Sequence, residues 1–115
     1  MAKTFDETEL MDRVDNDAEF LAETVEMLVA DGPSLLEQVR SAAAAGDAAG
    51  VGKHAHALKG MISNFCAPEA QACALQLEKM GKAGDLSTIG PAMEQMSSVL
   101  EGLTAELQAF VKEKA

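Results

Sequence analysis

A chain of 115 residues is long enough for one domain and too short for two ordinary ones, so we expect a single domain over residues 1–115. The apolar residues, 48% of the chain, are mainly Ala, Leu, Met and Val, which indicates an all-α fold. The formal net charge of −10 argues against binding to nucleic acid or to anionic lipid, because both require Lys and Arg to neutralise phosphates.

The sequence also has neither a membrane-spanning stretch nor the apolar core of a signal peptide, and we therefore expect a soluble, cytoplasmic protein. Its two cysteines, Cys66 and Cys73, are too few for a disulfide framework. In a reducing cytosol we expect both to be small buried residues.

The first predicted helix is short and covers about residues 6 to 13. The second covers about residues 17 to 45, because apolar residues recur there at steps of four and three, with Gly32 at the missing step: Leu21, Val25, Leu28, Leu35 and Val39. The phase continues past Gly32 and Pro33, which predicts either one kinked helix or two nearly collinear helices. Gly46 and Asp47 end this element and cap the next one.

Three more helices complete the prediction. The third covers about residues 48 to 65 and ends before Pro68, which starts a fourth helix that runs to about Lys82. The fourth carries one apolar stripe of Ala70, Cys73, Leu77 and Met80. The fifth begins firmly near residue 91, with Ile89, Met93, Met96, Leu100, Leu103, Leu107 and Phe110 at alternating steps of four and three. Short connections between long amphipathic helices predict an antiparallel four-helix bundle, with the short additional N-terminal helix laid across it.

Both histidines lie on the third predicted helix, and they point in different directions. The core-facing stripe of that helix consists of Val51, Ala55, Leu58, Ile62 and Phe65. At about 100° per residue, His54 lies roughly 60° and His56 roughly 140° from the middle of this stripe. We therefore expect His54 to border the core and His56 to face water.

The neighbours of His56 suit it to chemistry on an exposed imidazole. Gly52 and Gly60 lie one turn before and after it, and removing side chains there leaves the ring approachable by another macromolecule. Lys53 and Lys59, three residues before and after, bring positive charge, and we expect Lys59 to face solvent. A ring nitrogen could then attack phosphorus while Lys59 stabilises the phosphoryl oxygens. The plainer interpretation is that the lysines only solvate this face and that Gly52 belongs to a weak helix start.

The stretch HALKG at residues 56–60, followed by Ser63, resembles the H-x-L-K-G motif of the histidine-containing phosphotransfer (HPt) domains of bacterial multistep phosphorelays. The resemblance extends over FDETELMDRVDNDAEFLAETVEMLVADGPSLLEQVRSAAAAGD and over LQLEKMGKAGD, which look like the usual N-terminal half and the usual run into the last helix. It implies that His56 is phosphorylated, that Lys59 is the basic partner of the phosphate, and that Gly60 admits the loops of a partner. With Gly60, we expect Ser63, Lys53 and Gly52 to form the partner-binding face.

One residue departs from the family pattern. Members usually have glycine ten residues after the histidine, whereas this chain has Cys66. Cysteine is poor at positive φ, so the departure puts in question the backbone geometry after the third helix.

The resemblance implies a phosphoryl carrier rather than an autonomous kinase. His56 would accept a phosphoryl group from a receiver-domain aspartate and pass it reversibly to another receiver domain. The chain contains no G-x-x-x-x-G-K or G-x-G-x-x-G loop for a nucleotide. We expect no cofactor and no metal site in this chain, with Mg²⁺ only in the partner receiver domain, and we expect a monomer.

Other functions stay open at this point. The nearest alternative is an interaction module with the HPt fold and no phosphorylation. A zinc site of His54, His56, Cys66 and Cys73 would require the third helix to break, because the two histidines diverge around it. A di-iron bundle lacks the required Glu-x-x-His pairs, and Ser/His/Asp or Cys/His hydrolase chemistry lacks a recognisable context. A domain cut from a hybrid or chemotaxis kinase is also conceivable, although Met1 and the polar C-terminus favour a free-standing protein.

Overall fold

The computed structural model describes residues 4–115, and every regular element in that part of the chain is helical. Met1, on which the expectation of a free-standing protein partly depends, lies outside the described residues. The elements are α1 (Glu7–Arg13), α2 (Ala18–Ala44), α3 (Ala48–Ile62), the short 3-10 helix η1 (Ser63–Phe65), α4 (Pro68–Ala83) and α5 (Ile89–Lys114). The all-α prediction is confirmed, and each predicted boundary is right to within a turn of helix.

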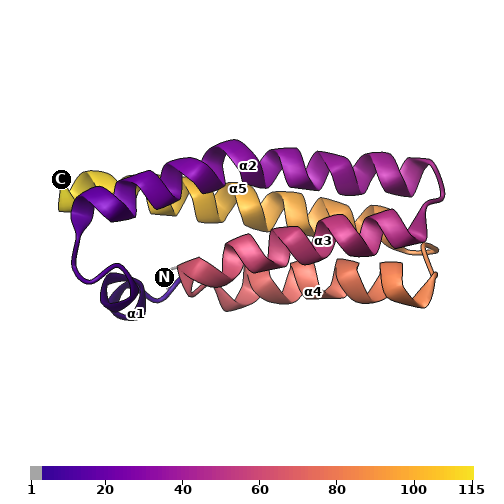
Figure 1. Cartoon of the computed structure of the whole chain (residues 1–115), viewed down its shortest axis with the longest axis horizontal. Helices are drawn as coiled ribbons and strands as arrows, with labels where there is room; N and C mark the ends of the chain where they lie inside the picture. Colours follow the sequence, from indigo (N-terminus) through magenta and orange to yellow (C-terminus); the bar gives the residue numbers. More distant parts are fainter. Residues whose placement is uncertain (1–3) are drawn as a thin grey trace.

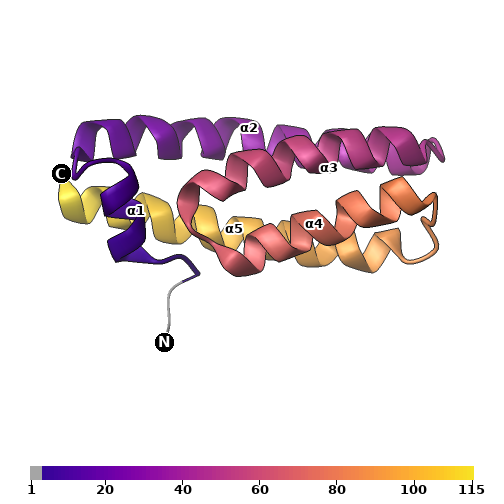
Figure 2. The ribbon, with the colours of Figure 1, turned by 60° about the horizontal axis from the view of Figure 1, so that its bottom comes forward.

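The four long helices lie alongside one another in an elongated molecule, and consecutive ones run in opposite directions (Figure 1). Helix α3 packs against α2 and α4, and α5 packs against the same two helices from the other side. Helix α1 lies across one end of this arrangement, near the C-terminus (Figure 2). The result is a helical bundle in which α3 and α4 pack closely along one side.

Three of the helices, α1, α2 and α3, begin at aspartate caps. The carboxylates of Asp6, Asp17 and Asp47 accept hydrogen bonds of 2.9–3.0 Å from backbone N–H groups at the starts of α1, α2 and α3. Each cap satisfies an N–H that would otherwise lack a partner, and its negative charge complements the helix dipole. The α3 cap fixes where the histidine-bearing helix begins.

Helix α2 runs unbroken through Pro33, so the single-helix alternative is right. Gly32 is buried in this helix, where an added Cβ would lie 3.5 Å from the side chain of Leu100 on α5. One predicted core position is wrong, because Leu36 is buried whereas Leu35 is only half-buried. After the proline, α2 therefore directs Leu36 rather than Leu35 into the core. The other predicted positions are buried as expected: Leu21, Val25, Leu28 and Val39.

The turn after α3 is built around Cys66, whose backbone is left-handed with φ 54° and ψ 47°. Its carbonyl accepts a 2.9 Å hydrogen bond from the N–H of Asp6, which ties the start of α1 to this turn. The half-buried side chain packs against the core, and its burial raises the pKa of the thiol, with a further contribution from the nearby carboxylate of Glu9. Cys66 thus occupies a conformation that glycine adopts without strain.

We expect Cys66→Gly to stabilise the fold. The left-handed conformation costs a non-glycine residue roughly 1–2 kcal/mol, and the added freedom of glycine in the unfolded chain offsets part of the gain. Urea unfolding should show a free energy of unfolding raised by about 0.5–1 kcal/mol. Gly84→Ala is the matched control: Gly84 has φ 69°, and we expect alanine there to destabilise. A less stable Cys66→Gly would mean that packing of the thiol outweighs backbone strain.

Candidate functional site

The two histidines of α3 face different environments, as the helical phase predicted. The side chain of His56 is 67% exposed, whereas His54 is half-buried on the α2 side, where it lines a shallow depression with Ser34 and Gln38. The residues that anchor the opposite face of α3 to the core are fully buried: Val51, Ala55, Leu58 and Ile62. The core therefore fixes the direction in which His56 points.

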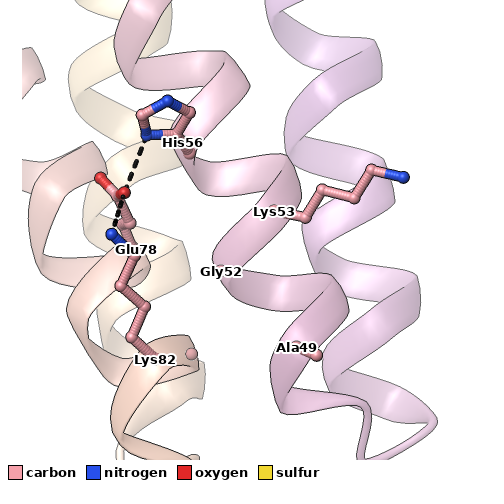
Figure 3. Close-up of a pocket in the computed structure, with 7 residues that line it drawn as sticks. Ala49, Gly52, Lys53, His56, Glu78 and Lys82 are labelled. Atoms are coloured by element: carbon pink, nitrogen blue, oxygen red, sulfur yellow. Dashed lines mark hydrogen bonds and ion pairs between the residues drawn. The ribbon is translucent and has the colours of Figure 1, made fainter.

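The ring of His56 is held by a buried carboxylate on the neighbouring helix. Its Nδ1 lies 2.8 Å from Oε2 of Glu78, a side chain that is only 2% exposed (Figure 3). Glu78 belongs to α4 and lies on the core-facing side of that helix, with Ala74, Leu77 and Gly81. The contact joins the two helices directly at the exposed imidazole.

Two lysines complete the surroundings of Glu78. Lys59 of α3 places its Nζ 2.7 Å from Oε1, and Lys82 of α4 places its Nζ 2.9 Å from Oε2. The pKa of Glu78 is lowered from 4.5 to about 2. The largest cause is the hydrogen bond from Lys59, followed by the one from Lys82, and His56 contributes less. Together these bonds outweigh burial, which by itself would raise the pKa. Glu78 is therefore an ionised carboxylate at neutral pH.

The charge state of Glu78 determines the tautomer of His56. A carboxylate can only accept hydrogen bonds, so Nδ1 of His56 must donate and must carry the proton. In the neutral ring, Nε2 then holds the free lone pair. Figure 3 shows Nδ1 directed at Glu78 and the other ring nitrogen directed away from it. The site presents one defined nucleophilic atom.

The pKa shift of Glu78 predicts acid sensitivity. Because its folded-state pKa is about 2 and its ordinary value is 4.5, Glu78 contributes stability above pH 4.5 that is lost as the pH falls towards 2. Glu78→Gln should remove part of this dependence, so the melting temperatures of variant and wild type should converge as the pH falls across this window. The measurement is circular dichroism melting from neutral pH to about pH 2.5, above the point of complete protonation. Glu94→Gln is a matched control, because it makes the same change on an exposed carboxylate of α5. Parallel curves for wild type and Glu78→Gln would contradict the assignment.

The positions of the predicted lysines differ from expectation. Lys59 does not face solvent freely: its side chain is 26% exposed, and its ammonium binds buried Glu78. Lys53 is exposed but extends away from His56 (Figure 3). The second ammonium beside the His56–Glu78 pair comes from Lys82 instead. Lys59 is thus partly structural, since its loss would leave Glu78 with one fewer compensating charge.

Gly52 also has a different role from the predicted one. It is buried against α4, where an added Cβ would lie 3.5 Å from the backbone nitrogen of Lys82. The facing glycine, Gly81, is closer still: an added Cβ would overlap the backbone of Gly52 and lie 2.8 Å from the carbonyl oxygen of Ala48. Gly52 therefore serves close packing of two helices, one turn from the His56–Glu78 pair, and does not open space above the ring.

Gly60 does open space, as the sequence suggested, since an added Cβ would meet no atom within 4 Å. It lines an open groove of about 320 Å³ between α2 and α3, together with Met27 and Ala57. Met27 is 59% exposed and so adds apolar surface to this groove. Ser63 caps α3, because its hydroxyl donates a 2.6 Å hydrogen bond to the carbonyl of Gly60.

Two residues of the site, Glu78 and Lys82, were not predicted from the sequence. The sequence carries no signal for Glu78, because at about 100° per residue it lies roughly 120° from the middle of the predicted stripe of Ala70, Cys73, Leu77 and Met80. Its burial follows from the close packing of α3 on α4. Once it is buried, the carboxylate needs compensating charges, and Lys82, one turn later, supplies one.

The structure also bears on the metal sites considered in the sequence analysis. Helix α3 is continuous, so His54 and His56 diverge. Across residues 4–115, no group of three or more His, Cys, Asp or Glu side chains is placed to hold a metal ion. Within the same residues, no helix combines the length and the apolar character needed to cross a bilayer. Fold and site together define a helical domain with one exposed imidazole that a buried carboxylate holds in place.

Comparison with known proteins identifies the family of such domains. The Hpt domain family matches residues 23–112, which is most of the chain, and the chain belongs to that family. Membership gives it a histidine phosphotransfer role in phosphorelays. Among solved structures, histidine-containing phosphotransfer protein B (HptB) from Pseudomonas aeruginosa PAO1 superposes with a TM-score of 0.90 over 98% of each chain. At 22% identity this likeness concerns the fold alone. No curated protein matches the chain.

Proposed function

We propose that His56 is the phosphorylated residue and that it exchanges its phosphoryl group with receiver-domain aspartates. The observation that carries the proposal is the exposed ring whose Nδ1 is held by buried Glu78. The lone pair on Nε2 attacks the phosphorus of an aspartyl phosphate. The new P–N bond forms as the P–O bond breaks, and the aspartate leaves as a carboxylate with the electron pair. Transfer to the next receiver is the reverse of this step.

Glu78 supports this step by charge as well as by orientation. As the P–N bond forms, the ring gains positive character, and a carboxylate 2.8 Å from Nδ1 stabilises it. Lys59 and Lys82 keep Glu78 ionised in the resting protein. For Lys59 to bind the phosphoryl oxygens, as the family resemblance implies, its ammonium must shift away from Oε1 of Glu78. Glu78 and Lys82 are therefore positioning residues for His56.

The receiver domain docks, in this proposal, over the groove beside Gly60. The absence of a side chain at Gly60 leaves room for a partner's loop one turn from His56, and exposed Met27 supplies an apolar contact. Ser63 supports this surface through Gly60, and Lys53 contributes charge at its edge. Gly52 is buried and acts only through the packing of α3 on α4.

The remaining parts of the proposal follow from the sequence and from the arrangement of the helices. We infer an antiparallel four-helix bundle of α2 to α5 with α1 across one end, acting as a single monomeric domain in the cytoplasm of a bacterium. The chain would carry no cofactor and no ATP site, and the receiver's carboxylates would hold any Mg²⁺. The competing function is an interaction module with this fold and no phosphorylation.

Phosphotransfer profiling separates the two functions. Purified protein is mixed with each receiver domain of the same genome, after the receiver has been phosphorylated with a radioactive label. We expect at least one receiver to label this protein at a single site, with a phosphoryl bond that is lost in acid and survives base. Stable binding of a receiver without any transfer of label would favour the interaction module.

A further inference from the structure

Charge is unevenly distributed around His56. Helices α3 and α4 carry four of the chain's nine Lys and Arg residues and only two of its nineteen Asp and Glu residues. One of those two is Glu78, which is buried and already compensated. On α4, the surface presented to a partner is therefore cationic, because Lys79 and Lys82 are both exposed. Exposed Lys53 of α3 extends away from this group (Figure 3).

The α2 side of the same site has the opposite sign. Exposed Met27 is bracketed by Glu23 and Asp31, which lie one turn before and after it and so share its face of α2. Both acidic side chains are exposed. Thr24 and Met27 line the groove beside Gly60, and Glu23 and Asp31 lie within one turn of these lining residues on α2.

His56 lies at the boundary between these two regions. On the α4 side, the ring and Lys82 line an open cavity of about 370 Å³, whose floor is formed by Gly52 and Gly81. On the α2 side, Gly60, one turn after His56, lines the apolar groove. A macromolecule that reaches Nε2 must contact or approach both regions at once.

We propose that the receiver domain which exchanges phosphate with His56 presents a divided surface: acidic side chains opposite Lys79 and Lys82 of α4, and cationic side chains opposite Glu23 and Asp31 of α2. This inference rests on the proposed function. Complementary charge raises the rate of encounter and penalises orientations that bring like charges together. A rotated receiver would place acid against acid, so the division fixes how the partner sits over His56.

The test uses charge reversals with matched controls on α5. The test variants are Lys79→Glu and Glu23→Lys/Asp31→Lys, and they leave His56, Glu78 and Lys82 intact. The controls are Lys112→Glu and Glu94→Lys/Glu101→Lys, which make the same changes in net charge on exposed positions of α5. The probe is the phosphorylated receiver that labels wild type fastest in the profiling experiment, and rapid quench gives the second-order rate constant.

At low salt, we expect each test variant to react about tenfold more slowly than wild type and each control to stay within about threefold. Raising the salt to about 0.5 M should close most of this gap, because exposed charges are screened. Transfer at saturating receiver should change little, since the chemistry at His56 is untouched.

Two results would overturn the divided surface while leaving phosphotransfer in place. One is an equal effect of test and control variants. The other is that a second copy of this chain occupies the groove. In that case sedimentation would show self-association that increases with concentration, and Met27→Asp would abolish it. Failure of every receiver to label wild type, at any salt, would instead overturn the proposed function on which the inference depends.

Discussion

Replacing His56 by Gln is expected to abolish labelling by phosphorylated receivers, whereas replacing His54 by Gln is expected to leave it within about twofold of wild type, because His54 neither reacts nor positions the reacting ring. The nitrogen lone pair of the Gln amide is delocalised into its carbonyl and does not attack phosphorus, so loss at His56 should be complete. His54 lies on the other side of α3, towards α2, and lines a different depression from the one that His56 and Glu78 line. The measurement is transfer of radioactive phosphate from a receiver, followed to saturation.

Both variants should retain the helical circular dichroism spectrum, because His56 is exposed and His54 is half-buried at the edge of the core. The pair is therefore a matched control for general damage to α3. Equal loss of label in both variants would show that exposure alone does not identify the reactive ring. Retention of label in His56→Gln would place the phosphoryl group elsewhere and remove the function proposed for this site.

The helices and the directions of the histidines could be predicted because both depend on local spacing. Apolar residues at steps of three and four fix which side of a helix is buried, and the phase then places every other residue on that helix. The exposure of His56 follows from this argument, whereas the turn before α4 follows from Pro68 itself. The exception is that Leu36 is buried in place of Leu35, a shift of one residue that comes after Gly32 and Pro33.

The contact between His56 and Glu78 could not be predicted in the same way. It depends on how far α3 is displaced along α4, and a single sequence gives the phase of each helix but not the register between them. Glu78 also lies roughly 120° from the middle of the apolar stripe predicted for α4, so the sequence did not indicate that its carboxylate is buried. Lys59 was misplaced for the same reason, because its buried partner lies on another helix.

Gly52 and Gly81 show the same limit, and they also give a sharp test of what sets the register. Both glycines are buried in the contact between α3 and α4, and the sequence alone does not distinguish them. An added Cβ at Gly52 meets the facing backbone at ordinary distances of 3.5–3.7 Å, whereas one at Gly81 lies 2.6 Å from the Cα of Gly52. Backbone atoms of two packed helices cannot move aside singly, so relief requires α3 and α4 to separate.

We therefore expect Gly81→Ala to lower the free energy of unfolding by about 2 kcal/mol, since overpacking outweighs the better helix propensity of alanine. Gly52→Ala adds the same methyl group from the opposite helix and should leave stability unchanged or raise it by up to about 1 kcal/mol. Separation of the helices should also lengthen the contact from Nδ1 of His56 to Glu78. The imidazole ¹⁵N signals would then report a mixture of tautomers in Gly81→Ala, together with slower phosphotransfer, while Gly52→Ala keeps the Nδ1–H form. If both variants kept the wild-type tautomer and rate, the glycine contact would not be what holds Glu78 against the reactive ring.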